Sequence, residues 1–316
     1  MEKIRIGISS CLLGAKVRFD GQHKQDSYIT GTLSHWFEFV PVCPEVELGL
    51  GIPRETIRLE GDPENPRLVK TKSGEDLTDS MKAYCRKRVA ALSKEELGGY
   101  ILKSRSPSCG MERVKVYSKK GMPSNKGRGI YADELVKRFP LIPVEEEGRL
   151  NDPALRERFI EQVFTLQRWR RMLQESNTRG GLVKFHEQHK YLLMAHSVQY
   201  YRAMGRLVAE MKGMKLATVQ EEYLEMLMSA LRLRATTAKH VNVLQHLTGY
   251  FKKQLNSDEK QELQETVAAY KSGHFPLIVP VTLLNHYIRK YDESYLKQQV
   301  YLKPGPTELR LRNQIY

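Results

Sequence analysis

Short apolar runs alternate with helical patterns along the first half of the chain. The runs predict buried strands, and they occupy residues 4–8, 38–42, 67–70, 100–103 and 141–144. Helical spacing predicts a short helix or turn at residues 28–36 and helices at 76–92 and 130–139. Strands separated by helices are typical of parallel βαβ units. We therefore predict an α/β domain with a mostly parallel, Rossmann-like sheet.

The pattern changes after a polar stretch at residues 145–153. From residue 154 to residue 302, apolar residues recur almost only at helical spacing. One such stripe consists of Phe159, Val163, Phe164, Leu166 and Trp169. Glycine-containing breaks separate the stripes, which predicts an all-α helical bundle of roughly six or seven helices. The chain is thus expected to contain two domains, at residues 1–150 and 151–316.

Two polar stretches interrupt the pattern of the first half. Residues 119–129 are basic and show no apolar periodicity, which predicts a mobile loop. The segment from Pro53 to Asn65 is charged and interrupted by proline, and Gly61-Asp62-Pro63 and Asn65-Pro66 mark turns there.

Composition is that of an ordinary globular protein, with 41% hydrophobic and 28% charged residues. The first apolar run is too short for a signal peptide, and no run approaches the roughly 18 residues that span a bilayer. We therefore expect a cytoplasmic protein with no membrane partner and with its four cysteines reduced. A cysteine set in that compartment more often binds a metal or takes part in catalysis than forms disulfides.

The net charge of +14 is unevenly distributed. Residues 1–150 contain 26 Lys and Arg against 21 Asp and Glu, whereas residues 151–316 contain 25 against 16. This surplus indicates either a solvated basic surface or a domain that binds a polyanion. Candidate RNA contacts in the second half are Arg168, Arg170, Arg171, Arg232, Arg234, Lys239, Lys252 and Lys253. Candidates in the basic stretch of the first half are Lys119, Lys120, Lys126 and Arg128.

Three cysteines follow predicted strands. Cys11 follows the first strand, Cys43 the second, and Cys109 lies in the loop after strand 100–103. Because the carboxyl ends of parallel strands meet at one edge of a sheet, we expect these thiols to lie together. Their separations of 32 and 66 residues do not match the tight repeats of zinc fingers or ferredoxins. A metal or cluster site, a reactive thiol and unconnected structural cysteines therefore all remain open, and Cys85, inside a helical pattern, is expected not to be a ligand.

Three separated motifs carry a resemblance to a known family. They are Ser9-Ser10-Cys11 with the segment Val17 to Gly21, then Cys43-Pro44-Glu45, then the segment Lys103 to Gly110. Over residues 1–150 they resemble the thiouracil desulfidase family. Residues 180–300 are similar to the YbgA-type helical domain, and the joined arrangement resembles tRNA 4-thiouridine desulfidases.

The resemblance implies an iron–sulfur enzyme. It implies a [4Fe–4S] cluster held by Cys11, Cys43 and Cys109, with the fourth iron left open for the sulfur of a thiocarbonyl. Water would then replace the sulfur, and hydrosulfide would leave without net redox change.

Two further groups are expected to be catalytic. Glu45 follows a proposed ligand by two residues and is the expected proton-transfer group. Ser104 is the expected group that orients water or substrate, with Ser106 and Ser108 as alternatives.

The basic second domain favours a thiolated base that is part of a polynucleotide, because phosphate contacts position nucleic acids. The expected partner is tRNA that contains 4-thiouridine, and the expected products are uridine and sulfide. Free thiouracil or thiouridine is the alternative substrate. An RNA sulfurtransferase and a non-catalytic RNA-binding redox sensor are alternative functions, although the sequence contains no Gly-x-x-x-x-Gly-Lys loop for ATP.

Overall fold

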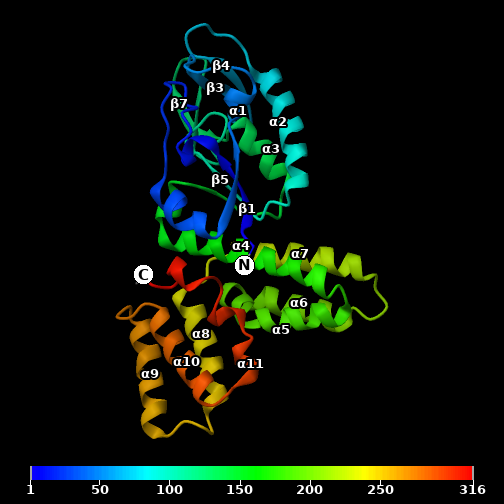
Figure 1. Ribbon diagram of the computed structural model, residues 1–316, viewed down its shortest axis with the longest axis vertical. Coiled ribbons are helices and arrows are strands. Elements are labelled where there is room, and N and C mark those ends of the chain that lie inside the picture. The colour runs from blue at the N-terminus through cyan, green and yellow to red at the C-terminus, as the bar shows by residue number, and fades with distance from the viewer. Residues whose placement is uncertain (1, 315–316) are drawn as a thin grey trace. The chain divides into compact units, whose positions relative to one another are not determined.

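A computed structural model gives the structure of the chain and describes residues 2–314 (Figure 1). Its contacts divide the chain into two compact units, Met1–Phe159 and Ile160–Tyr316. The first unit is an α/β fold and the second is helical. The predicted fold class is confirmed.

A four-stranded sheet, sheet A, lies at the centre of the first unit. Its strands are β1 (Ile4–Ser9), β2 (Phe37–Val42), β5 (Gly99–Leu102) and β8 (Val144–Glu146), in the order β2-β1-β5-β8. Every pairing is parallel, so the four carboxyl ends lie at one edge. The side chains of β1 and β5 are mostly buried, as expected for a parallel sheet covered on both faces.

The last strand differs from its prediction. We expect a strand at residues 141–144 from the apolar run, whereas β8 occupies Val144–Glu146. Its two acidic residues, Glu145 and Glu146, are buried because other groups satisfy their carboxylates. The backbone N–H of Met111, for example, donates to Oε1 of Glu146 at 2.7 Å. A strand that buries paired carboxylates leaves no apolar pattern to detect.

Two helices cover the core of the first unit. Helices α2 (Thr78–Leu92) and α3 (Ile130–Arg138) lie alongside each other, as Figure 1 shows. Met81 of α2 and Leu135 of α3 are fully buried in this core. Both helices confirm their predictions, and the short helix or turn expected from residue 28 is present as a helical turn at Tyr28–Thr32.

A second sheet, sheet B, is the main feature that the hydrophobic pattern does not predict. Its strands are β3 (Ile57–Asp62), β4 (Asn65–Lys70), β6 (Val114–Tyr117) and β7 (Pro123–Gly127), in the order β4-β3-β6-β7. Strand β4 confirms its prediction. However, β7 lies in the expected mobile loop, so that expectation is wrong. Strand β3 is not predicted, whereas the turn expected around Gly61-Asp62-Pro63 is present and leads into β4. Strand β7 is an antiparallel hairpin partner of β6 with mostly exposed side chains, so backbone pairing rather than burial defines it. Strand β3 pairs antiparallel with β4 and parallel with β6, and it buries Leu59 in the core.

Seven long helices account for most of the described part of the second unit, and the first of them begins in the first unit. They are α4 (Pro153–Glu175), α5 (Arg179–His196), α6 (Val198–Glu210), α7 (Leu216–Arg232), α8 (Thr237–Thr248), α9 (Ser257–Lys271) and α10 (Ile278–Lys290). A short helix, α11 (Ser294–Lys297), follows. The predicted helical bundle is therefore confirmed.

Aromatic packing holds the start of this bundle together. Trp169, from the predicted stripe on α4, is buried and stacks on Tyr223 of α7, with 5.3 Å between ring centroids. The ring of Phe185 from α5 meets Trp169 edge-on at 5.2 Å. Within residues 2–314, no helix combines the length and the apolar character that crossing a membrane requires.

Candidate active site

The three candidate cysteines lie at the carboxyl edge of sheet A. Cys11 follows β1, Cys43 follows β2, and Cys109 lies in the loop after β5. These strands are neighbours in the sheet, and the structure brings all three thiols to one cavity of about 850 Å³. The strand order reverses direction between β1 and β5, and open α/β sheets bind their ligands at such points.

Burial dominates the electrostatics of these thiols. It raises the pKa of Cys11 to about 11, against the opposing effect of the Lys103 ammonium. It also raises the pKa of Cys43, and it raises that of Cys109 well above the ordinary value. Burial therefore opposes ionisation of each thiol in the absence of a bound cation.

All three thiols line the cavity. Within the described residues, no group of three or more His, Cys, Asp or Glu side chains is placed to hold a single metal ion. The thiols nevertheless influence one another, because negative charge on Cys43 or Cys11 raises the pKa of Cys109.

Glu45 is clamped in a fixed orientation. It lies on the short helix α1 (Pro44–Glu47), directly after Cys43. Its Oε2 accepts a hydrogen bond from Nε of Arg54 at 3.1 Å and another from Nη2 of the same guanidinium. Its Oε1 accepts one from Oγ of Ser108 at 2.6 Å. The Arg54 and Glu45 side chains are 5% and 15% exposed, so water hardly competes for these bonds.

A second carboxylate, that of Glu147, holds Ser104. The hydroxyl of Ser104 donates to Oε1 of Glu147 at 2.9 Å, and the backbone N–H of Ser104 donates to Oε2 at 2.7 Å. Nζ of Lys103 donates to the same carboxylate and to Oγ of Ser104, the latter at 3.0 Å. Ser104 and Lys103 line the cavity, so this hydroxyl is fixed at its surface.

The three serines of the loop after β5 have different hydrogen-bond partners. Oγ of Ser106 accepts hydrogen bonds from the backbone N–H groups of Ser108 and Cys109, at 3.2 and 3.1 Å, and so shapes the loop. Ser108 is fully buried and contacts Glu45. Ser104 and Ser106 both line the cavity, but the hydroxyl of Ser104 contacts Glu147 and Lys103 instead of the loop amides.

Sequence reasoning missed Arg54 and Glu147. Arg54 lies in the segment expected to form turns, and no local pattern marks it as a partner of Glu45. Glu147 lies in the polar stretch 145–153, which we expect to separate two domains, whereas the structure places it beside Ser104. Three successive carboxylates directly after a strand, at the same sheet edge as the cysteines, are the signal that could have found it.

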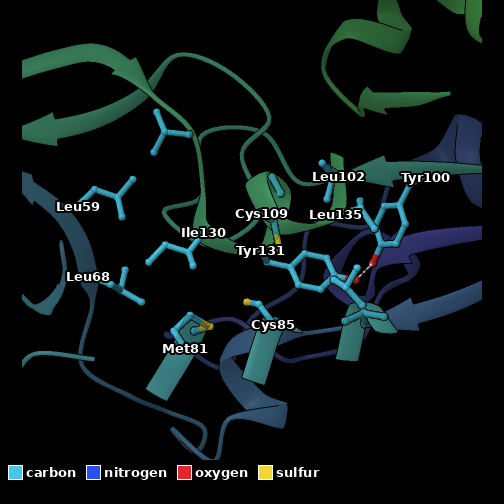
Figure 2. Close-up of a cluster of buried hydrophobic side chains, with 14 of the residues drawn as sticks. Leu59, Leu68, Met81, Cys85, Tyr100, Leu102, Cys109, Ile130, Tyr131 and Leu135 are labelled. Atoms are coloured by element: carbon cyan, nitrogen blue, oxygen red, sulfur yellow. Dashed lines mark hydrogen bonds between the residues drawn. The ribbon is translucent and has the colours of Figure 1, made fainter. Parts of the chain in front are cut away.

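Cys85 lies away from the cavity. It points from α2 into the apolar core of the first unit, beside Tyr131 (Figure 2). Burial raises its pKa to about 12, and it does not line the cavity that the other three cysteines share.

The candidate RNA contacts have different surroundings. Arg168 donates from Nη2 to the backbone oxygen of Pro304 at 2.6 Å, and Nζ of Lys239 donates to that of His196 at 2.6 Å. These two cations therefore have structural partners within the helical unit, and Arg170 is half-buried. The exposed candidates are Lys119, Lys120, Lys126, Arg128, Arg171, Arg232, Arg234, Lys252 and Lys253.

The fold and the site together define a class of protein. One α/β unit gathers three thiols, the held carboxylate of Glu45 and the fixed hydroxyl of Ser104 around a single cavity, which is the arrangement of an enzyme active site. A helical unit with exposed cations follows it in the chain.

Known proteins of the same class resemble both parts. The family model of 2-thiouracil desulfurase matches residues 6–147, and that of a protein of unknown function, DUF1722, matches residues 190–306. The chain is 31% identical over 153 residues to the YbgA protein of Escherichia coli (strain K12), which is 48% of this chain and 90% of YbgA. It is 32% identical over 108 residues to the YbbK protein of Bacillus subtilis (strain 168), or 33% of this chain and 71% of YbbK. A solved structure described as the [4Fe-4S]-dependent thiouracil desulfidase TudS is 28% identical, spans 49% of this chain and 97% of its own, and has a TM-score of 0.39.

The chain therefore has a 2-thiouracil desulfurase domain in its first unit, where residues 6–147 match that model, and it belongs with YbgA and YbbK among the proteins compared. The resemblance drawn from the three cysteine motifs is thereby confirmed.

Proposed function

We propose that this protein is a desulfidase that converts 4-thiouridine in tRNA to uridine and releases sulfide. The observation that carries the proposal is that Cys11, Cys43, Cys109 and Glu45 line one cavity in a unit of the 2-thiouracil desulfurase family. The reaction replaces a C=S bond by a C=O bond. Water supplies the oxygen, sulfur leaves as hydrogen sulfide, and no electrons are gained or lost.

The donor set fits a [4Fe–4S] cluster. Cys11, Cys43 and Cys109 offer soft sulfur ligands, and only a strongly positive group would keep such buried thiols deprotonated side by side. A cluster is larger than one ion, so sulfurs placed around a cavity can hold it. When bound, the cluster supplies a Lewis-acidic iron with a preference for the sulfur of a thiocarbonyl.

Glu45 would move the proton. Its carboxylate faces the cavity and accepts a proton from the attacking water, and the same group can then protonate the leaving sulfur. Arg54 and Ser108 fix both carboxylate oxygens, so the proton acceptor is in place before the substrate arrives.

Ser104 would orient the water or the substrate. Glu147 and Lys103 hold its hydroxyl at the cavity surface, so the direction of its lone pairs is set. Because its proton goes to Glu147, the hydroxyl can accept a hydrogen bond from a water molecule and hold that water in a fixed position.

The exposed cations of the second unit support tRNA as the substrate. Lys252 and Lys253 are adjacent and exposed, and contacts of this kind with phosphates position a nucleic acid without reading its sequence. The thiolated base must then leave its stack to enter a cavity.

Free thiouracil or thiouridine is the second candidate substrate. All residues that line the cavity, from Ser9 to Leu155, belong to the first unit. A free base therefore needs no residue of the helical unit.

Nucleoside analysis of thiolated tRNA tests the proposal. After anaerobic incubation with iron–sulfur-reconstituted protein, 4-thiouridine should disappear while uridine and sulfide increase by equal amounts. Unchanged tRNA together with desulfurated free thiouracil would favour the second substrate. A colourless, iron-free protein that remains active would refute the cluster.

A further inference from the structure

The loop after Cys11 presents an aromatic ring to the cavity. Phe19 is 39% exposed, although its side chain is large and apolar. It lines the same cavity as the three thiols and Glu45. The guanidinium carbon of Arg18 lies 5.4 Å from the centroid of its ring. An aromatic side chain and an arginine side chain thus meet at the wall of this cavity.

Backbone hydrogen bonds hold the turn that carries this ring. The turn that contains it is closed by a hydrogen bond from the N–H of Gly21 to the oxygen of Arg18 at 3.0 Å. The oxygen of Phe19 accepts a further bond, at 2.9 Å, from the N–H of Arg54. Because the side chain of Arg54 holds Glu45, one residue links the aromatic ring to the carboxylate.

We propose that Phe19 is a stacking platform for a nucleobase, with Arg18 supporting its ring. This inference rests on the proposed function and deepens it, because it names how the substrate is recognised. Unstacked bases bind on aromatic side chains and on arginine planes, since every base has a flat π-face. The stacked ring belongs either to the thiolated base or to its neighbour in an RNA strand, and both present the same chemistry.

Three variants of the full-length, reconstituted protein test the platform. Phe19→Leu keeps an apolar side chain but removes the ring, so the KM for substrate should rise about tenfold or more. Phe19→Tyr keeps the ring and should stay within about twofold of the unchanged protein. Phe275→Leu is the matched control, because Phe275 is 42% exposed and does not line the cavity. Equal KM values for the Phe19→Leu protein and the unchanged protein would overturn the platform, as would an equal rise in the control.

The choice of substrate identifies the stacked base. A rise in KM on both free 4-thiouridine and thiolated tRNA assigns the platform to the thiolated base. A rise on tRNA alone assigns it to the neighbouring base.

A binding readout separates this inference from the proposed reaction. Tryptophan at position 19, introduced as Phe19→Trp, should lose fluorescence when uridine or unthiolated tRNA is added, relative to the two native tryptophans. Quenching in a protein that converts no thiolated substrate would refute the desulfidase and keep the platform. Conversion without quenching, and with unchanged KM in Phe19→Leu, would refute the platform and keep the desulfidase.

Discussion

Two carboxylates at the edge of the cavity are held in the same way by different partners. Glu45 pairs with Arg54 and Glu147 pairs with Lys103, and each carboxylate also accepts a serine hydroxyl. Buried ion pairs of this kind add little net stability, because both charges lose their hydration. Their value here lies in orientation, since each pair fixes a group at the surface of the cavity.

Replacing Arg54 by glutamine should damage both stability and turnover. Glu45 would keep its buried charge without a partner, which costs about 3–5 kcal/mol in the free energy of unfolding. A displaced carboxylate should also lower kcat by about 10²-fold. Urea unfolding and steady-state kinetics on free 4-thiouridine measure the two effects, and visible absorbance reports whether the cluster is loaded. The control is Arg67→Gln, because the Arg67–Asp76 pair is exposed and should be worth no more than about 1 kcal/mol.

Replacing Ser104 by alanine should lower kcat by about 10²-fold and leave the unfolding midpoint nearly unchanged. The backbone N–H of Ser104 still reaches Glu147, so the loop keeps its anchor. Ser106→Ala is the comparison, since it removes the acceptor of two loop amides and should mainly lower stability. The reverse pattern, with Ser106 limiting kcat and Ser104 not, would contradict the roles that the geometry suggests.

The residues of the site differ in how far sequence predicts them. Cys11, Cys43 and Cys109 could be placed together because strand ends in a parallel sheet share an edge. The contact of Arg54 with Glu45 could not be predicted, because Arg54 lies in a loop that follows no periodic pattern. Similarly, the different roles of Ser104, Ser106 and Ser108 depend on their hydrogen-bond partners and not on their spacing.

At the level of elements, the start of α3 supports the loop that carries Cys109. A Cβ atom added to Gly129, which precedes α3, would lie 2.3 Å from the backbone oxygen of Ser108 and 2.9 Å from the backbone nitrogen of Cys109. The N–H of Gly129 also donates to the oxygen of Gly110 at 2.8 Å. Helix α3 and the Cys109 loop can therefore pack this closely only because Gly129 has no side chain.

Gly129→Ala should displace the Cys109 loop and lower the iron and sulfide content per protein by about half or more, because a core this dense cannot absorb an added methyl group. Iron and acid-labile sulfide analysis after reconstitution measures this loss. Gly31→Ala is the control, since nothing lies within 4 Å of the added Cβ there. Full iron content in the Gly129 variant would show that the loop does not depend on this contact.

Sheet A and the helices were predictable because burial imposes a regular apolar pattern. Sheet B was predicted only at β4, because β7 is an exposed hairpin strand of proline, serine, asparagine, lysine and glycine, and β3 is a short run of alternating apolar and charged residues. Strand β8 shifted because its buried residues are carboxylates with partners. In β7 and β8, hydrogen bonds of the backbone and of side chains take the place of apolar burial.

At the scale of the whole molecule, the helical unit should lose stability in acid. Burial lowers the pKa of His186 to about 4 and those of His189 and His240 to about 3, from an ordinary value of 6.5. Below about pH 6.5 the unfolded chain therefore binds protons that the folded unit does not. Each such group should lower the unfolding free energy by about 1.4 kcal/mol per pH unit as the pH falls from 6.5 toward 4.

Urea unfolding between pH 8 and pH 5 measures this slope. Trp169 reports on the helical unit when Trp36 is replaced by phenylalanine. His189→Phe should reduce the slope, because Nε2 of His189 has no hydrogen-bond partner and the ring stacks on Phe185. Equal stability at pH 5 and pH 7 would contradict the burial of neutral histidines.

Charge reversal in the helical unit should separate tRNA from free substrate. The double variant Lys252→Glu and Lys253→Glu should raise the KM for thiolated tRNA about tenfold and make it less dependent on salt, because fewer counterions are released. The KM for free 4-thiouridine should stay unchanged, since neither lysine lines the cavity. Equal effects on both substrates would argue against a phosphate-binding role.

The order of strands along the chain also determines when each site residue reaches its place during synthesis. Cys11 and Cys43 lie near the start of the chain, but Cys109 is placed only after β5 has paired with β1, and Glu147 only after β8 has paired with β5. A nascent chain therefore lacks a complete site until residue 147 has emerged from the ribosome, even if translation pauses before that point. On the proposed function, iron–sulfur loading is a late step in the biogenesis of the first unit, and it can proceed while the helical unit is still being synthesised.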